Sequence, residues 1–251
     1  MDLLIISILP IIFILIFVYR KDHINKEPFS KLLVTFCVGC FSVIPAAIME
    51  MKLSFFAPKG LIMAAAFEGY VVAGFSEELC KLILLMLIVW RSRHFDEYFD
   101  GIVYAVFLSM GFACVENITY VFGNDTWLGA ISTGTLRAFL SVPGHFLFAV
   151  AMGYYVALAK FDPKHRKKHL FHALLYPVIL HGTFDAIIMI SDAFTHQGTT
   201  LYTIVNLSLP IIFIYFDIKL WQQGIKRIEH LQEMSQQQEF DRQNPFYNFK
   251  W

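Results

Sequence analysis

Seven long apolar runs constrain the fold of this chain more than any other feature. A helix needs about 20 residues to cross a hydrocarbon core of roughly 30 Å, and each run is close to that length or longer. Only 16% of the residues are charged, against about 25% in a soluble domain. The sequence therefore predicts an all-α, polytopic bundle of transmembrane helices. The runs cover residues 2–19, 32–50, 61–90, 101–122, 131–159, 170–190 and 200–218.

The third run is long for one crossing. Residues 61–69 can lie at the interface or re-enter the membrane, with the crossing helix beginning near Tyr70. The bundle then has about seven spans, or eight if 61–90 divides.

Most basic loop residues follow the first, third and fifth runs, although the 51–60 loop also contains Lys52 and Lys59. Because loops rich in lysine and arginine face the cytoplasm, we expect the N-terminus outside and the C-terminus in the cytoplasm. The full chain has 20 basic and 20 acidic residues, so no basic excess favours nucleic-acid binding. The loop residues are Arg20, Lys21, Lys26 and Lys31, then Arg91 and Arg93, then Lys160, Lys164, Arg166, Lys167 and Lys168.

The four cysteines, Cys37, Cys40, Cys80 and Cys114, all lie inside apolar runs. Cys37-x-x-Cys40 has the spacing of a redox or metal motif, but no second ligand pair is nearby. Packing between helices is the favoured interpretation.

Ionisable residues inside the runs are the main indication of function. A charge at the bilayer centre costs at least about 2.5–3.5 kcal/mol, so such residues need partners and usually mark a functional site. Four consecutive runs, the third to the sixth, contribute them at similar depth, which favours a hydrated polar cavity. They are Glu77, Glu78, Lys81, Glu116, Arg137, His145, His181 and Asp185.

The spacing within these motifs suggests how they work. Glu77 and Lys81 are four residues apart on a helix and can pair, whereas Glu78 points ~100° away. We therefore expect Lys81 to neutralise Glu77 and Glu78 to face the cavity as a base that activates water. Asp185 is one turn beyond His181 and can orient its imidazole.

Position along the runs adds two expectations. His145 follows Pro143-Gly144, where a kink would open the helix. Glu116 and Asp185 are displaced toward the outer ends of their runs, so the cavity is expected to open outward.

Each residue also has a purely structural interpretation. A Glu–Lys pair can join helices, His145 alone can be a packed core residue, and Arg137 can extend toward the interface. Together, two adjacent glutamates, a third acid and two histidines at one level are costly for a merely structural bundle.

The motifs resemble those of the PrsW family of bacterial intramembrane proteases, which is distantly similar to the CAAX prenyl proteases. The similarity covers about residues 61–190. Signatures of zinc, aspartyl and rhomboid-type intramembrane proteases are missing. The motifs are Glu77-Glu78-x-x-Lys81, Phe112-x-x-x-Glu116-Asn117, His145 in Pro-Gly-His, and His181-x-x-x-Asp185.

The resemblance implies a multi-pass protein of the bacterial cell membrane. It would make the first, site-1 cut in a single-span anti-sigma factor, on the extracytoplasmic side. The resemblance places the catalytic core over 61–190. The composition, which becomes glutamine-rich after Lys219, separately predicts one transmembrane domain over 1–220 and a cytoplasmic tail over 221–251. The catalytic set would be Glu77, Glu78, Glu116, His145 and His181, supported by Lys81, Asn117 and Asp185, with His145 or Asn117 stabilising the oxyanion.

Two alternatives stay open. Glu78, Glu116, His145 and His181 could bind zinc or another divalent metal, although the resemblance favours a metal-free, glutamic-type peptidase. The same charges could instead serve a transporter or an immunity-type binding protein, although no inverted repeat is visible.

Overall fold

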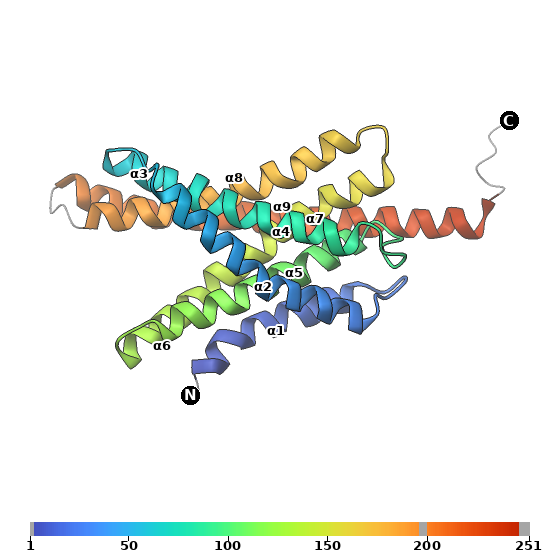
Figure 1. Cartoon of the computed structure of the whole chain (residues 1–251), viewed down its shortest axis with the longest axis horizontal. Helices are drawn as coiled ribbons and strands as arrows, with labels where there is room; N and C mark the ends of the chain where they lie inside the picture. Colours follow the sequence, from blue (N-terminus) through green and yellow to red (C-terminus); the bar gives the residue numbers. More distant parts are fainter. Residues whose placement is uncertain (1–2, 196–199, 246–251) are drawn as a thin grey trace.

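The computed structural model describes residues 3–195 and 200–245, and these residues form helices and no strand (Figure 1). The prediction of an all-α helical bundle is confirmed. The elements are α1 Leu3–Lys21, α2 Phe29–Ser54, α3 Leu61–Phe67, η1 Glu68–Phe75, α4 Ser76–Val89, α5 Asp100–Phe122, α6 Trp127–Leu136, η2 Arg137–Ser141, α7 Val142–Phe161, α8 Arg166–Thr195 and α9 Thr200–Gln243, where η marks a π-helical segment.

Five helices in the described part of the chain are long and apolar enough to cross a membrane. The protein is therefore a multi-pass membrane protein. The two remaining apolar runs form the helix Leu61–Val89, which continues through α3, η1 and α4 without a loop, and the start of α9. Seven spans remain a prediction. The five are Leu3–Lys21, Phe29–Phe56, Asp100–Phe122, Trp127–Phe161 and Arg166–Ser191.

The helix α5 lies at the centre of the bundle and packs against α1, α2 and α7. Its apolar window is 83% buried, whereas that of α1 is only 17% buried. A helix that is apolar on all sides belongs inside a bundle or against lipid. The outer helices accordingly expose large apolar side chains such as Phe13 and Phe41, which fits a surface covered by lipid.

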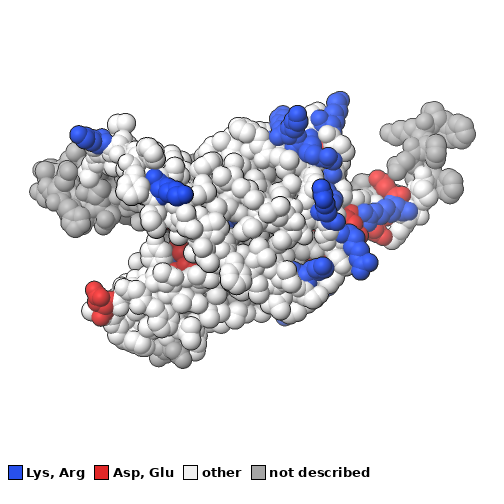
Figure 2. Space-filling model, viewed as in Figure 1, with Lys and Arg blue, Asp and Glu red and all other residues white. Residues whose placement is uncertain are grey.

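The loops gather at two opposite ends of the bundle (Figure 1). Loops 22–28, 90–99 and 162–165 share one end, where lysines and arginines are concentrated (Figure 2). We call this the basic end. Loops 55–60 and 123–126 lie at the opposite end, so the alternation of basic loops predicted from the sequence has a counterpart in the fold.

Buried carboxylates accompany the exposed positive charge at the basic end. Asp22, Glu27, Glu97 and Asp100 are each at most 3% exposed. Burial, followed by the neighbouring carboxylates, raises the pKa of Glu97 to about 7. Burial also raises the pKa of Glu27 to about 8 although Tyr104 donates a hydrogen bond to it. Holding these acids together therefore has an electrostatic cost.

The helix α9 extends into the sequence that we expected to form a tail. Of its apolar residues at helical spacing, Ile228 and Leu231 are buried against the bundle, whereas Ile225 is exposed. At the basic end Ser235 Oγ accepts a hydrogen bond of 2.9 Å from the backbone N–H of Phe99. The segment thus packs on the protein itself, and its division into a separate cytoplasmic tail remains a prediction.

All four cysteines are free. Cys80 is buried and its Sγ lies 3.8 Å from Sδ of Met49 on α2. These contacts fit the packing interpretation.

Candidate active site

Two π-helical segments lie directly before two of the sequence motifs. The segment η1 ends at Phe75, just before Glu77 and Glu78, and η2 ends at Ser141, four residues before His145. We expected a kink at Pro143, which has no N–H to donate to the preceding turn. Instead of a sharp kink, the structure has the π-helical segment η2 just before this residue. π-Helical turns are frequent at functional sites.

A close crossing of η1 and α8 brings the first and last motifs together. A Cβ atom added at Gly69 would lie 2.7 Å from the backbone nitrogen of Ala186, so only glycine allows this approach. Gly182 packs in the same way against Tyr70. His181 precedes Gly182, so the crossing places its ring beside Glu78.

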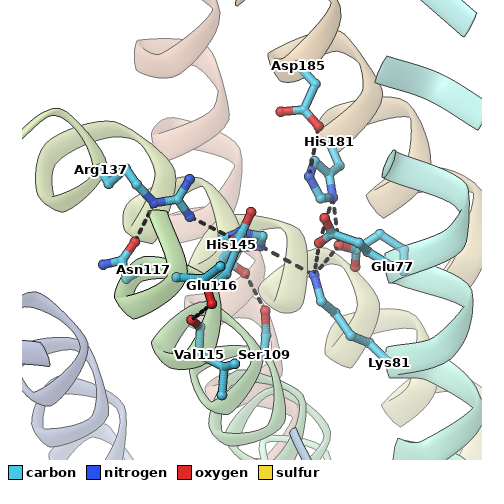
Figure 3. Close-up of polar contacts among 12 residues, drawn as sticks. Glu77, Lys81, Ser109, Val115, Glu116, Asn117, Arg137, His145, His181 and Asp185 are labelled. Atoms are coloured by element: carbon cyan, nitrogen blue, oxygen red, sulfur yellow. Dashed lines mark hydrogen bonds and ion pairs between the residues drawn. The ribbon is translucent and has the colours of Figure 1, made fainter. Parts of the chain in front are cut away.

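Lys81 lies at the centre of the polar cluster (Figure 3). Its Nζ is 2.8 Å from Oε1 of Glu78, 3.0 Å from Oε2 of Glu77 and 3.3 Å from Nδ1 of His145. It also lies 4.0 Å from the ring centroid of Phe112. With Lys81 only 1% exposed, the ammonium group is held almost entirely by protein groups.

His181 joins α8 to α4. Its Nδ1 lies 2.9 Å from Oε1 of Glu78, and its Nε2 lies 3.2 Å from Oδ2 of Asp185. The expected i,i+4 contact between His181 and Asp185 is therefore present. Phe148 stacks on the imidazole with ring centroids 4.8 Å apart, which fixes the plane of the ring.

Glu116 and His145 form the other half of the cluster. His145 Nε2 lies 2.7 Å from Oε2 of Glu116, and Arg137 places a guanidinium nitrogen 2.8 Å from the same oxygen. The rings of His145 and His181 are 5.2 Å apart. The structure therefore brings all five residues of the expected catalytic set into one cluster (Figure 3). They are Glu77, Glu78, Glu116, His145 and His181.

A cavity of about 840 Å³ reaches this cluster. Glu77, Glu116, His145, His181 and Asp185 lie on its wall. Other lining residues come from the ends of α2 and α5 that lie away from the basic end, and Figure 2 shows a hollow with acidic atoms on that side. The cavity therefore opens opposite the basic end, in agreement with the expected outward displacement.

The arrangement of the two adjacent glutamates differs from the sequence prediction. We expected Lys81 to hold Glu77 and to leave Glu78 facing the cavity. Instead Lys81 pairs with both carboxylates, and Glu77 lines the cavity while Glu78 does not. Residues three and four positions before Lys81 are both within its reach, and the contact with His181 turns Glu78 inward.

The contacts of Asn117 and Arg137 also bear on two interpretations made from the sequence. Asn117 is fully buried, its amide N–H donates to the carbonyl of Ser7, and its Oδ1 accepts from Nε of Arg137. It is not among the residues that line the cavity, which favours the supporting role through Arg137 over the oxyanion role. Arg137 does not extend to the interface, because Glu116 and Asn117 hold its guanidinium group.

Among the lining residues that the sequence did not single out, Phe148 and Glu50 contribute an aromatic ring and a carboxylate. Phe148 lies three residues after His145, so helical spacing alone could have placed it on the same face. Glu50 lies at the end of an apolar run and reaches the cavity from α2. Its position at a run boundary made it resemble an ordinary interfacial acid.

Four side chains of the cluster could together offer ligand atoms to a metal ion. One ligand atom from each of Glu77, Glu78, His145 and His181 lies within 4.8 Å of the others, and two nitrogens with two oxygens suit zinc in type and number. Glu77 replaces Glu116 in the set predicted from the sequence. However, the ammonium of Lys81 already contacts three of these four residues. A divalent cation at the same point would face that positive charge, so the residues as arranged do not fit a metal.

A membrane-embedded helical bundle that holds glutamates and histidines around a cavity fits the class of intramembrane proteases. Sequence comparisons agree with this class. The profile described as "PrsW family intramembrane metalloprotease" matches residues 27–215. The chain belongs to the PrsW family and is a peptide hydrolase.

Curated relatives match most of the chain. The sequence is 33% identical to Protease PrsW of Clostridioides difficile, over 91% of each chain. It is 32% identical to Protease PrsW of Bacillus subtilis, over 92% of this chain and 96% of that one. It is 34% identical to the Geobacillus kaustophilus protein of the same name, over 74% and 79%. No solved structure matches the chain.

Proposed function

We propose that this protein makes the first cut in a single-span anti-sigma factor, on the extracytoplasmic side of the bacterial membrane. The observation that carries the proposal is the cavity that leads from the end opposite the basic loops to Glu77, His145 and His181. Basic loops mark the cytoplasmic side, so a substrate would enter from the outer side. The resemblance noted in the sequence supplies the anti-sigma factor as substrate class.

Glu77 is the proposed base, because it lines the cavity while Glu78 is turned inward. Its carboxylate takes a proton from water, and the water oxygen attacks the carbonyl carbon of the substrate peptide bond. The tetrahedral intermediate carries a negative oxygen. When the C–N bond breaks, the proton passes from Glu77 to the leaving nitrogen, which gives a new carboxylate and a new amine.

Glu78, Lys81 and Asp185 are proposed as positioning residues. Glu78 and Asp185 hold opposite nitrogens of His181, and Lys81 fixes both glutamates. His145 is the remaining candidate for stabilising the oxyanion, and Glu116 orients its ring. No step of this scheme passes through a metal ion.

Reconstitution with a single-span substrate tests the proposal. The purified protein in lipid vesicles should cut a candidate anti-sigma factor once, near its outer membrane boundary, and mass spectrometry of the fragments should locate the cut. Glu77→Gln and His181→Ala should abolish cleavage. Leu87→Ala, which alters a side chain on α4 that is 73% exposed, is the matched control and should cleave normally. Equal cleavage by Glu77→Gln would contradict the proposed base.

A further inference from the structure

A second cluster of ligand-type side chains lies at the basic end, apart from the protease site. Asp22 and Glu27 come from the loop between α1 and α2, Glu97 from the loop before α5, and Asp100 begins α5. Glu116 of the protease site is 16 residues further along α5, or roughly 24 Å at 1.5 Å per residue. The two clusters are therefore separate.

The four carboxylates use only some of their oxygens in the fold. Asp22 Oδ2 accepts the backbone N–H of Glu27 at 3.0 Å. Asp100 Oδ2 accepts the backbone N–H groups of Asp96 and Glu97 at 2.9 and 2.8 Å, and Tyr104 donates to Glu27 Oε2. These contacts fix the side chains of Asp22, Glu27 and Asp100 and leave the second oxygen of each of these three acids uncommitted.

The uncommitted oxygens are buried and have no protein partner. They are Oδ1 of Asp22, Oε1 of Glu27 and Oδ1 of Asp100. Within the described residues no lysine, arginine or histidine forms an ion pair with any of the four acids. Burying ionised carboxylates without a directly paired cation is expensive, and a cation bound among them would remove that cost.

Glu97 is the most informative member. Its side chain has no hydrogen bond within residues 3–195 and 200–245, although the residue is only 3% exposed. One of its oxygens lies within 4.8 Å of an oxygen from both Asp22 and Asp100. Two oxygens bound to one Ca²⁺ at about 2.3–2.6 Å are at most about 5 Å apart. Oxygens of three carboxylates are thus close enough together to bind one Ca²⁺ ion, and Mg²⁺ would require them to move slightly closer.

We propose that Asp22, Glu97 and Asp100, with Glu27 beside them, bind one Mg²⁺ or Ca²⁺ ion at the basic end. All of the ligands are oxygens, which these ions prefer over the nitrogen and sulfur donors that zinc favours. The ion joins the first basic loop to the start of α5. Because Phe99 in the same loop hydrogen-bonds Ser235, the ion also stabilises the docking of α9.

Calorimetry on the purified full chain, stripped with EDTA, tests the site with MgCl₂ and CaCl₂ in separate titrations. The wild type should bind one ion per chain, and its thermal midpoint should rise on binding. The preferred ion is the one that binds at the lower concentration. Absence of stoichiometric binding of both ions at millimolar concentration would overturn the proposal.

Variants separate this site from the protease site. Glu97→Gln should weaken binding by at least about tenfold, and because it breaks no hydrogen bond it should raise the thermal midpoint of the stripped protein. His145→Ala/His181→Ala should bind the ion as the wild type does. Glu229→Gln, a change at an exposed acid on α9, is the matched control. Unchanged binding by both Glu97→Gln and Asp22→Asn would overturn the assignment of ligands.

Discussion

Nδ1 of His181 lies 2.9 Å from Oε1 of Glu78, and this single contact joins two motifs that are 103 residues apart in sequence. It connects α8 to α4 inside a membrane protein, where an unpaired charge is costly. The same contact turns Glu78 away from the cavity and leaves Glu77 on the wall. The two adjacent glutamates therefore have different surroundings, and their substitutions should differ as well.

The first prediction separates these two glutamates. Glu77→Gln should lower kcat by about 10²–10⁴-fold, the usual contribution of a general base, with little change in thermal stability. Glu78→Gln should lower activity and also destabilise the fold by about 1–3 kcal/mol, because it weakens the hydrogen bonds to Lys81 and His181. Cleavage rates and thermal unfolding of both variants in the same detergent check this. Equal stability losses would show that the two positions are equivalent.

The second prediction concerns Lys81 and metal ions. Since its ammonium contacts Glu77, Glu78 and His145, activity should survive chelation, and the active protein should lack stoichiometric zinc. Lys81→Met should be inactive and less stable, because two buried carboxylates lose their cation. Elemental analysis of the active fraction, with cleavage assays before and after chelation, provides the measurement. Stoichiometric zinc together with activity lost on chelation would contradict a metal-free reaction.

The third prediction concerns Arg137. Its Nε donates to Asn117, another guanidinium nitrogen pairs with Glu116, and the group stacks 4.3 Å from the ring centroid of Tyr120. Lysine cannot reproduce this planar geometry. Arg137→Lys should therefore lower activity at least about tenfold, because Glu116 no longer orients His145. Arg137→Ala should lose more, and a kcat effect with unchanged KM would confirm a positioning role.

The helical crossing at Gly69 gives the fourth prediction. In Gly69→Val the added side chain meets the backbone of α8, so η1 must move away and the contact between Glu78 and His181 must lengthen. We expect loss of activity and a destabilisation of about 1–3 kcal/mol, as for an overpacked core. Leu87→Ala on the exposed face of α4 is the control. Normal activity of Gly69→Val would show that the crossing does not position the site.

The sequence predicted much of this arrangement because charges in an apolar run are conspicuous. Glu77, Glu116, His145 and His181 stood out for that reason, and the spacing of His181 and Asp185 predicted their contact. Spacing could not tell which glutamate faces the cavity, since that depends on the crossing of η1 with α8. Nor could it place Asn117, whose partner Ser7 is 110 residues away in sequence. Long-range packing decided both outcomes.

The docking of α9 gives the last prediction. Ser235 Oγ accepts the buried backbone N–H of Phe99, and substitution by valine leaves that N–H without an acceptor. A buried unsatisfied donor costs about 1–3 kcal/mol, so Ser235→Val should lower the thermal midpoint and increase amide exchange along residues 221–243. Gln236→Ala changes the exposed neighbour and should have no such effect. If both variants exchange at the wild-type rate, the contact does not hold α9 on the bundle. If amide exchange along α9 becomes faster in Ser235→Val alone, this helix is part of the folded unit rather than an independent tail.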